Sequence, residues 1–320
     1  MTDKPPILFI NSTYPPVLDD LIEHFTVYNY RDATDKKALV AAAAPHARAV
    51  FTNGSAWIPA MLDALPKLAM IACTSTGYDE FDIAAIKRRG IRMSHSTGLT
   101  STDVSDLGMA LMLGAARRIP WADRYVRSGD WLAKGRAPMT RRVTGKKLGI
   151  VGLGAIGRKV AKKASGFDMD ISYTGPRRKD DVPYRYYANL LDMARDVDFL
   201  LLACIGGPTT AGIVNAEVLK ALGPDGILVN VARGSCVDEP ALLAALQDGT
   251  IGGAGLDCYA TEPTDPRRFA GIENLALTPH FSSGTPDTRK AISAHGIANL
   301  QAFFAGKPLL TPIPEIPNGQ

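Results

Sequence analysis

The chain has 320 residues and a formal net charge of +4, from 36 Lys and Arg against 32 Asp and Glu. Its hydrophobic fraction of 46% and charged fraction of 21% are ordinary for a globular protein, which excludes a disordered or collagen-like chain. The basic residues are scattered and the net charge is small, so nucleic-acid binding is not indicated. This length predicts about two domains.

The cysteines and the N-terminus favour a reduced, cytoplasmic protein. Cys73, Cys204, Cys236 and Cys258 form no CxxC motif and have no histidine at ligand spacing, so we expect neither a zinc site nor a disulfide framework. Each lies in an apolar or Gly-rich stretch, which predicts small core residues. We find no secretory signal and no apolar run of the length, about 18 residues, that a membrane span needs.

The first third alternates short apolar runs with segments of helical spacing. We expect strands at 7–11, 26–29, 47–52, 68–73 and 91–94, and helices at 17–24, 34–44 and 81–89. Strands that alternate with helices predict a parallel sheet covered on both faces.

A longer helix, rich in Leu, Met and Ala, is predicted over 104–119. Ser101, Thr102 and Asp103 offer N-cap side chains before it. Pro120 is expected to end the helix. The basic and aromatic stretch 121–143 has no clear period, so we expect an irregular connection there.

A second α/β alternation begins near Lys147. We expect strands at 148–152, 171–174, 199–204, 227–232, 253–257 and 275–278, and helices at 155–165, 215–222, 239–247 and 288–304. The whole chain therefore reads as α/β, with two doubly wound parallel-sheet domains.

A glycine fingerprint links the first strand and helix of this second part. Gly152, Gly154 and Gly157 have the G-x-G-x-x-G spacing, and Ala155 and Ile156 open the helix. The first glycine permits the tight turn, the second admits a pyrophosphate to the backbone, and the third lets helix and strand pack closely. The phosphate would lie on the N–H groups at the helix start. The pattern predicts dinucleotide binding; the alternative is a Gly-rich turn in an unliganded domain.

The next strand predicts which dinucleotide is bound. An NAD site is expected to place Asp or Glu at the end of that strand, but Asp170 lies at its start. The carboxyl end instead carries Thr174, Gly175, Arg177 and Arg178. Arginine there would accommodate a 2′-phosphate, so NADP is favoured over NAD. The alternative is a solvated basic turn, neutralised by the two aspartates that follow.

Three later motifs carry a family resemblance. They are Asn230-Val-Ala-Arg233-Gly-Ser235, Leu256-Asp-Cys-Tyr-Ala-Thr-Glu262-Pro263 and Leu277-Thr-Pro-His280. With the fingerprint, they resemble the D-isomer-specific 2-hydroxyacid dehydrogenases over nearly the whole chain. The basic turn and Val182-Pro-Tyr-Arg-Tyr-Tyr187 are similar to the NADPH-dependent glyoxylate/hydroxypyruvate reductases within that family.

The resemblance implies a catalytic set of Arg233, Glu262 and His280. Arg233 would clamp the carboxylate and keto oxygen of a 2-keto acid, because a planar guanidinium holds two oxygens and polarises the carbonyl. His280 would give its proton to the developing alkoxide. Glu262 would bind the other ring nitrogen and favour the protonated imidazole. Taken singly, these could be a surface arginine, a helix-start glutamate and a core histidine.

Further contacts follow from the same resemblance. The cofactor would also meet Cys204 and Pro208 on its adenosine side, Val231 and Ala232, and Asp257 at the nicotinamide amide. The substrate carboxylate would meet backbone N–H groups around Ser75, Thr76 and Gly77, with Arg233 and His280 completing the substrate site. The chain departs from the family pattern at 74–76 and at Ser282, which puts substrate choice and the nicotinamide pocket in doubt.

The expected domains are a flavodoxin-like substrate and catalytic domain, 1–98 with 286–320, and a Rossmann NADP-binding domain, 99–285. The active site would lie in a cleft between them, whose closure would exclude water. The resemblance also implies a homodimer built through the helix 104–119 and the arm 121–131. No metal, nucleic acid or membrane partner is expected.

Two alternatives stay open at this point. One is an NAD-linked D-2-hydroxyacid or phosphoglycerate-type dehydrogenase. The other is a non-enzymatic dinucleotide sensor, similar to the corepressors in this family. A formate dehydrogenase is disfavoured, because Glu262 stands at a position where those enzymes look to carry Gln. The sequence does not name the physiological 2-keto acid, since one methylene changes selectivity by only about 1–3 kcal/mol.

Overall fold

The computed structural model describes residues 4–54 and 60–318. The chain divides into two compact units, one formed by Met1–Thr100 with Ser283–Gln320 and the other by Ser101–Ser282. The sequence placed these divisions at 98/99 and 285/286. We call them the first and second unit and describe each by itself.

The first unit contains a parallel five-stranded sheet in the order β2-β1-β3-β4-β5. Its strands are β1 (Pro6–Phe9), β2 (Thr26–Asn29), β3 (Ala49–Thr52), β4 (Met70–Cys73) and β5 (Arg92–Ser94). Its helices are α1 (Val17–His24), α2 (Lys36–Ala43), α3 (Ala60–Ala64), α4 (Ile83–Arg88) and α12 (Pro286–Phe304). This strand order is that of flavodoxin-like domains, as predicted.

Alternating side chains build a core on each face of this sheet. In and just after β1, Ile7 and Phe9 pack with α1 and α12, whereas Leu8 and Ile10 pack with α2, α3 and α4. This is the period of two expected of a strand buried on both faces. Ile313, in the C-terminal segment of the chain, packs into the core that contains Leu8 and Ile10.

The second unit contains a parallel seven-stranded sheet in the order β12-β11-β10-β9-β6-β7-β8. The strands are β6 (Lys147–Val151), β7 (Asp170–Thr174), β8 (Arg185–Tyr187), β9 (Phe199–Leu202), β10 (Ile227–Asn230), β11 (Gly253–Leu256) and β12 (Leu275–Leu277). The chain order reverses between β6 and β9, which is the switch point where open α/β sheets bind ligands. This is the Rossmann order predicted from the sequence, extended by one strand.

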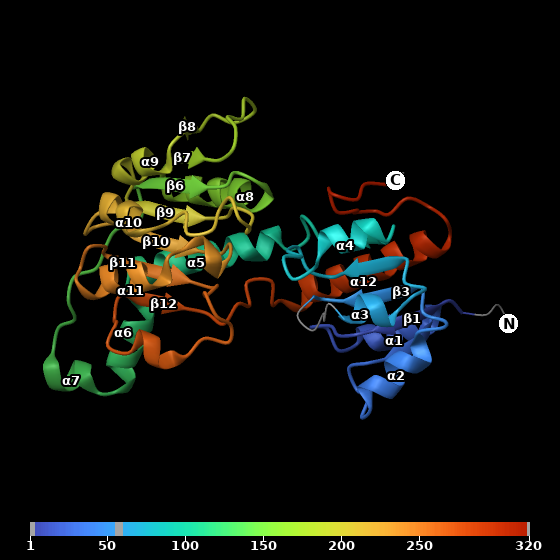
Figure 1. Ribbon diagram of the computed structural model, residues 1–320. Coiled ribbons are helices and arrows are strands. Elements are labelled where there is room, and N and C mark those ends of the chain that lie inside the picture. Colours follow the sequence, from blue (N-terminus) through green and yellow to red (C-terminus); the bar gives the residue numbers. More distant parts are fainter. Residues whose placement is uncertain (1–3, 55–59, 319–320) are drawn as a thin grey trace. The chain divides into compact units, whose positions relative to one another are not determined.

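Helices cover both faces of this second sheet (Figure 1). One face packs against α5 (Ser101–Ala116) and α8 (Ala155–Ala164), and the other against α9 (Leu190–Asp196), α10 (Ala216–Leu222) and α11 (Glu239–Gln247). Three short 3-10 turns lie at Ser165–Phe167, Gly234–Cys236 and Pro266–Phe269. Within the described residues, no helix is long and apolar enough to cross a membrane.

The prediction for the segment after α5 was wrong. The chain turns at Arg118, which adopts a left-handed conformation with φ 50°, and Pro120 lies in the first turn of α6 (Ile119–Arg127). Proline is tolerated there because the first N–H groups of a helix have no partner inside it. A further helix, α7 (Asp130–Lys134), follows, so 121–143 is not simply irregular. Both helices expose apolar side chains, among them Val126 in α6 and Leu132 in α7.

The sequence also gave no prediction of α3, β8 and α9, which are short elements of three to seven residues. Most other elements match the prediction and differ only at their ends. Ser101 and Thr102, expected before the long helix, instead form its first turn.

Candidate active site

The predicted catalytic side chains follow three neighbouring strands of the second unit. Arg233 follows β10, Glu262 lies in the loop after β11, and His280 follows β12. Because these strands are parallel and adjacent, their carboxyl ends meet at one edge of the sheet. All three residues therefore lie in the unit that the sequence assigned to the cofactor.

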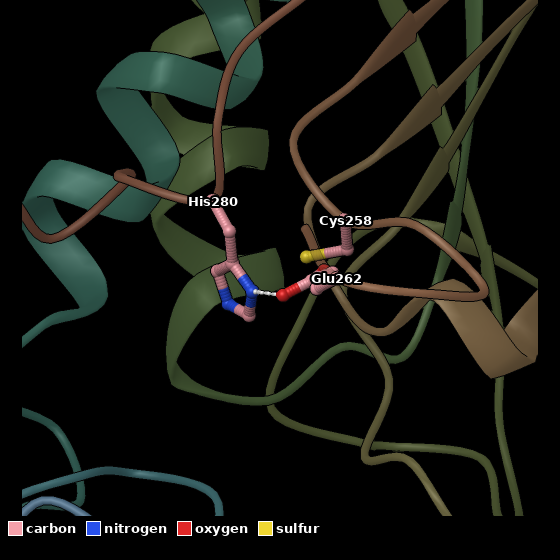
Figure 2. A group of neighbouring side chains, drawn as sticks. All are labelled: Cys258, Glu262 and His280. Carbon is pink, nitrogen blue, oxygen red and sulfur yellow. Dashed lines mark hydrogen bonds and ion pairs between the residues drawn. The ribbon is translucent and has the colours of Figure 1, made fainter. Parts of the chain in front are cut away.

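His280 and Glu262 form a close pair (Figure 2). The Nδ1 atom of His280 lies 2.5 Å from Oε2 of Glu262, and about four-tenths of each side chain is exposed. The other carboxylate oxygen, Oε1, accepts a hydrogen bond of 3.0 Å from the backbone N–H of Tyr259. The carboxylate is thereby held in place, and the Nε2 atom is left as the ring nitrogen that can reach a ligand.

Arg233 joins this pair through a shared carbonyl. Its Nη1 atom donates to the carbonyl of Ala232 at 2.9 Å, and the Cys258 thiol donates to the same oxygen at 3.5 Å. Cys258 in turn has its Sγ within 4.8 Å of ligand atoms of Glu262 and His280. The structure thus brings together the three residues that the motifs predicted.

Asn230 holds the backbone from which Arg233 extends, a role that the sequence analysis missed. This side chain is buried, accepts from the N–H of Ala232 at 3.0 Å and donates to the carbonyl of Arg233 at 2.9 Å. An asparagine at the end of a buried strand, directly before the motif arginine, was the available signal. On the opposite side, the arginine stem passes close to Gly206, where an added Cβ would lie 2.6 Å from its Cγ.

Asp257, expected at the nicotinamide amide, is fully buried and bonded to the histidine loop. Its Oδ1 accepts from the Thr278 hydroxyl at 2.7 Å and from the N–H of Phe281 at 3.1 Å, and its Oδ2 accepts from the N–H of Ser282 at 3.2 Å. These bonds enclose His280, whose backbone has a positive φ of 49°. Ser282, a departure from the family pattern, is thus bonded to Asp257 through its backbone.

Two of the three fingerprint glycines, Gly152 and Gly157, are required by close packing in the turn. Gly152 has φ 94°, and a Cβ on it would lie 2.7 Å from the Cα of Cys204. A Cβ on Gly157 would strike the carbonyl of Gly152. A Cβ on Gly154 would meet nothing within 4 Å, and both Gly154 and Ala155 are exposed at the start of α8. Two glycines therefore pack the strand–helix turn, and the third leaves an open approach to the N-terminus of a ten-residue helix, which fits a pyrophosphate.

The basic turn after β7 is supported from beneath by two tyrosines. The Tyr173 hydroxyl accepts from the N–H of Lys179 at 2.7 Å, and the Tyr186 hydroxyl donates to the carbonyl of Gly175 at 3.0 Å. Arg177 and Arg178 are both exposed, and Thr174 is buried at the end of the strand. The nearest ion pair of Arg178, to Asp180, is long at 3.8 Å.

The remaining predicted cofactor contacts differ in accessibility. Cys204 is half-buried after β9 and its Sγ lies 3.9 Å from that of Cys236, whereas Pro208 is exposed in the same loop. The hydrogen bond from Cys204 lowers the pKa of the Cys236 thiol. Val231 and Ala232 are buried, so they can offer a ligand little but backbone atoms. Cys73, Cys236 and Cys258 are buried as predicted, and Cys204 is only partly so.

The predicted carboxylate loop lies in the first unit, directly after β4. The Ser75 hydroxyl donates to the carbonyl of Asn53 at 2.6 Å, and the Thr76 hydroxyl lies 2.8 Å from that of Thr100. Within residues 4–54 and 60–318, no hydrogen bond is made by the backbone N–H groups of Ser75, Thr76 or Gly77. The side chains are thus used to hold the loop, and its N–H groups fit an anion.

Comparison with known proteins decides the family. Residues 109–282 match the model described as D-isomer specific 2-hydroxyacid dehydrogenase, NAD binding domain. The chain is 41% identical over 303 residues to hydroxyphenylpyruvate reductase of Plectranthus scutellarioides, covering 94% of this chain and 96% of that protein. The chain belongs to the D-isomer-specific 2-hydroxyacid dehydrogenases.

Two further relatives bear on cofactor and substrate. The dehydrogenase is 45% identical over 253 residues to a glyoxylate/hydroxypyruvate reductase, HPR3, of Arabidopsis thaliana, covering 79% of this chain and 78% of that one. The fold of the present chain matches that of an NADPH-dependent glyoxylate/hydroxypyruvate reductase of Sinorhizobium meliloti, solved with NADP and malonate. That match has a TM-score of 0.89 and 34% identity, and it covers 98% of both chains. The dehydrogenase is accordingly an oxidoreductase with an NAD(P)-binding domain.

Proposed function

We propose that this dehydrogenase reduces a small 2-keto acid of the glyoxylate or hydroxypyruvate type to the D-2-hydroxy acid, with NADPH as the preferred cofactor. The observation that carries the reaction type is the His280–Glu262 pair, at 2.5 Å, beside Arg233 at the ends of three adjacent strands. The substrate class is supported by the names of the Arabidopsis and Sinorhizobium relatives.

The chain's residues divide the chemistry among them. Bound reduced nicotinamide supplies the hydride. The Arg233 guanidinium holds the substrate carboxylate and the keto oxygen, and it stabilises the negative charge that develops on that oxygen. His280 donates the proton on Nε2 to the same oxygen, because Nδ1 is engaged by Glu262. In the first unit, the N–H groups of Ser75, Thr76 and Gly77 are proposed to bind a carboxylate.

The cofactor site is assigned to the switch-point edge of the second sheet. The residues from Gly152 to Gly157, including Ala155 and Ile156, would hold the pyrophosphate. Cys204 and Pro208 would border the adenosine, and the backbone of Val231 and Ala232 would face the nicotinamide. Asp257, although fully buried, accepts only one hydrogen bond on Oδ2 from the described residues, and we propose this oxygen as the acceptor for the nicotinamide amide.

NADPH is favoured over NADH by the turn after β7. No carboxylate stands at the end of that strand, and Arg177 and Arg178 are exposed there. A 2′-phosphate would meet two guanidinium groups and no opposing Asp or Glu at the strand end.

We also propose a cytoplasmic homodimer. The arm formed by α6 and α7 exposes Ile119, Val126, Trp131 and Leu132, the last at 95%. Such a run of apolar side chains fits an interface with a second copy. The first unit is proposed to act as the substrate domain and the second as the cofactor domain.

A substrate and cofactor panel tests the proposal. Purified enzyme is assayed with glyoxylate, hydroxypyruvate, hydroxyphenylpyruvate, 2-ketogluconate and 3-phosphohydroxypyruvate, each with NADPH and with NADH. The highest kcat/KM is expected for glyoxylate or hydroxypyruvate with NADPH. Preference for NADH with a larger acid would favour the NAD-linked alternative, and tight cofactor binding without turnover would favour a dinucleotide sensor.

A further inference from the structure

Cys258 places a thiol beside the His280–Glu262 pair (Figure 2). The Cys258 Sγ, one ring nitrogen of His280 and one carboxylate oxygen of Glu262 all lie within 4.8 Å of one another. The thiol is buried, and its side chain points toward the imidazole. Neither the hydride transfer nor the proton transfer proposed above uses this sulfur.

These three atoms suit zinc better than other biological divalent cations. Zinc accepts sulfur, nitrogen and carboxylate oxygen together, commonly with water as the fourth ligand of an open site. Magnesium and calcium require oxygen ligands, which a thiol and an imidazole do not provide. We propose that Cys258, Glu262 and His280 form a zinc-binding site whose occupation inhibits the enzyme.

The present geometry is close to what zinc requires. Zinc bonds of about 2.0–2.3 Å in a tetrahedral arrangement place ligand atoms about 3.3–3.7 Å apart. The His280–Glu262 pair, now 2.5 Å apart, must open by about 1 Å, and the sulfur, which lies within 4.8 Å of both partners, must come to about 3.7 Å from each. Both partners of the pair are partly exposed, so an ion can reach them from solvent.

The charges of the site oppose and assist binding in identifiable ways. Burial raises the pKa of Cys258 to about 12, the neighbouring Asp257 carboxylate raises it further, and the Arg233 guanidinium lowers it. Zinc binds the thiolate, so binding releases the thiol proton. The Arg233 guanidinium repels the cation, whereas the thiolate and Glu262 together balance its two positive charges.

Inhibition follows from the competition for Nδ1. Zinc bound to His280 would separate the imidazole from Glu262 and prevent the ring from taking up and donating a proton. This consequence rests on the proposed function, but the binding itself does not. The test therefore measures metal binding directly as well as activity.

The experiment uses the full chain after chelator treatment, with cobalt(II) as a spectroscopic probe and zinc in calorimetry. Wild type is expected to bind one ion with a thiolate-to-cobalt charge-transfer band. Cys258→Ala should abolish the band and weaken zinc binding by at least about 10- to 100-fold, the loss typical even for residues that only support a ligand. Cys258→Ser serves the same purpose if the alanine variant does not fold.

Cys236→Ser is the matched control, because Cys204 and Cys236 form a separate thiol pair in the same unit. This variant should keep the cobalt band. Zinc should inhibit wild type reversibly, with activity restored by chelator, and at least tenfold more zinc should be needed for Cys258→Ala. The proposal is overturned if Cys258→Ala binds cobalt as wild type does, or if the band is lost in Cys236→Ser instead. If no keto acid is reduced at all, the cobalt band still decides whether the site exists.

Discussion

His280 has one ring nitrogen held by Glu262 and the other available to a substrate. We expect His280→Ala to lower kcat by about 10²- to 10⁴-fold, because a positioned acid typically contributes that much. NADPH affinity should stay nearly unchanged, since His280 is proposed to act on the keto oxygen of the substrate and not on the cofactor. Steady-state kinetics and a fluorescence titration of NADPH measure the two quantities. Near-normal turnover in this variant would refute the proton-donor role.

Arg233 is expected to act as a two-pronged clamp rather than as a point charge. Arg233→Lys keeps the positive charge but loses the planar fork that holds two oxygens. We expect a raised KM for glyoxylate and a reduced kcat, with kcat/KM lower by about 10- to 100-fold. Steady-state kinetics at saturating NADPH measures both parameters. If only the cofactor affinity changes, Arg233 is not the substrate clamp.

The identities of the candidate catalytic residues could be predicted because each stands in an ordered motif after a buried strand. Their supporting contacts could not. The double hydrogen bond of Asn230 depends on the local turn of the chain after β10, and the proximity of Cys258 to His280 depends on how strands β11 and β12 align side by side. Residues more than twenty positions apart in the sequence become neighbours only through that register.

At the scale of elements, Asp257 ties the loop that follows β12 to the end of β11. Asp257→Asn keeps the size but replaces one acceptor oxygen with an NH₂ group, which would face a backbone N–H donor from Phe281 or Ser282. We expect a lower kcat and a shifted pH profile of kcat, because the position of His280 depends on this loop. Profiles of kcat against pH for the wild type and for Asp257→Asn measure this shift. A variant that loses thermal stability but keeps the wild-type profile would show a purely structural role.

The turn after β7 is expected to carry the NADPH preference. Replacing both Arg177 and Arg178 by Ala should raise KM for NADPH by about 10- to 100-fold and leave KM for NADH nearly unchanged. The loss should shrink in high salt, because both arginines are exposed and exposed charges are screened. KM values for both cofactors at low and high salt measure the effect.

Arg195→Ala is a suitable control for that variant. Arg195 is exposed on α9 and pairs with Asp192, away from the turn. Arg195→Ala should change neither the KM for NADPH nor the KM for NADH. Equal weakening of both cofactors in the double variant, or a wild type that already prefers NADH, would mean that the basic turn is only a solvated surface.

Across the whole molecule, the alternation of strands and helices was sufficient to predict two doubly wound sheets. The helical arm was not predicted in this way, because Pro120 was expected to end a helix and instead lies in the first turn of α6. Short elements such as β8, with three residues, are similarly too brief to establish a period.

In the first unit, hydrogen bonds link helix α12 through the C-terminal segment to the residue that follows β5. The stability that these contacts contribute is expected to depend on pH. In α12, the Nε2 atom of His295 lies 2.7 Å from the Thr311 hydroxyl, which donates to the carbonyl of His95 at 2.6 Å. Burial, with a smaller contribution from the His95 imidazole, lowers the pKa of His295 below its usual value of 6.5. The unfolded chain therefore binds more protons than the folded chain once the pH falls below about 6.5.

Stability should accordingly be complete above that pH and decrease as the pH falls toward the lowered pKa of His295. We expect His295→Gln to reduce this dependence, because glutamine keeps a donor for Thr311 but does not titrate. Differential scanning calorimetry between pH 5 and 8 should show a smaller decrease in Tm for His295→Gln than for wild type. His24→Gln, at an exposed position of α1, should leave the wild-type dependence intact. An unchanged slope in His295→Gln would show that other groups govern the acid sensitivity of this unit.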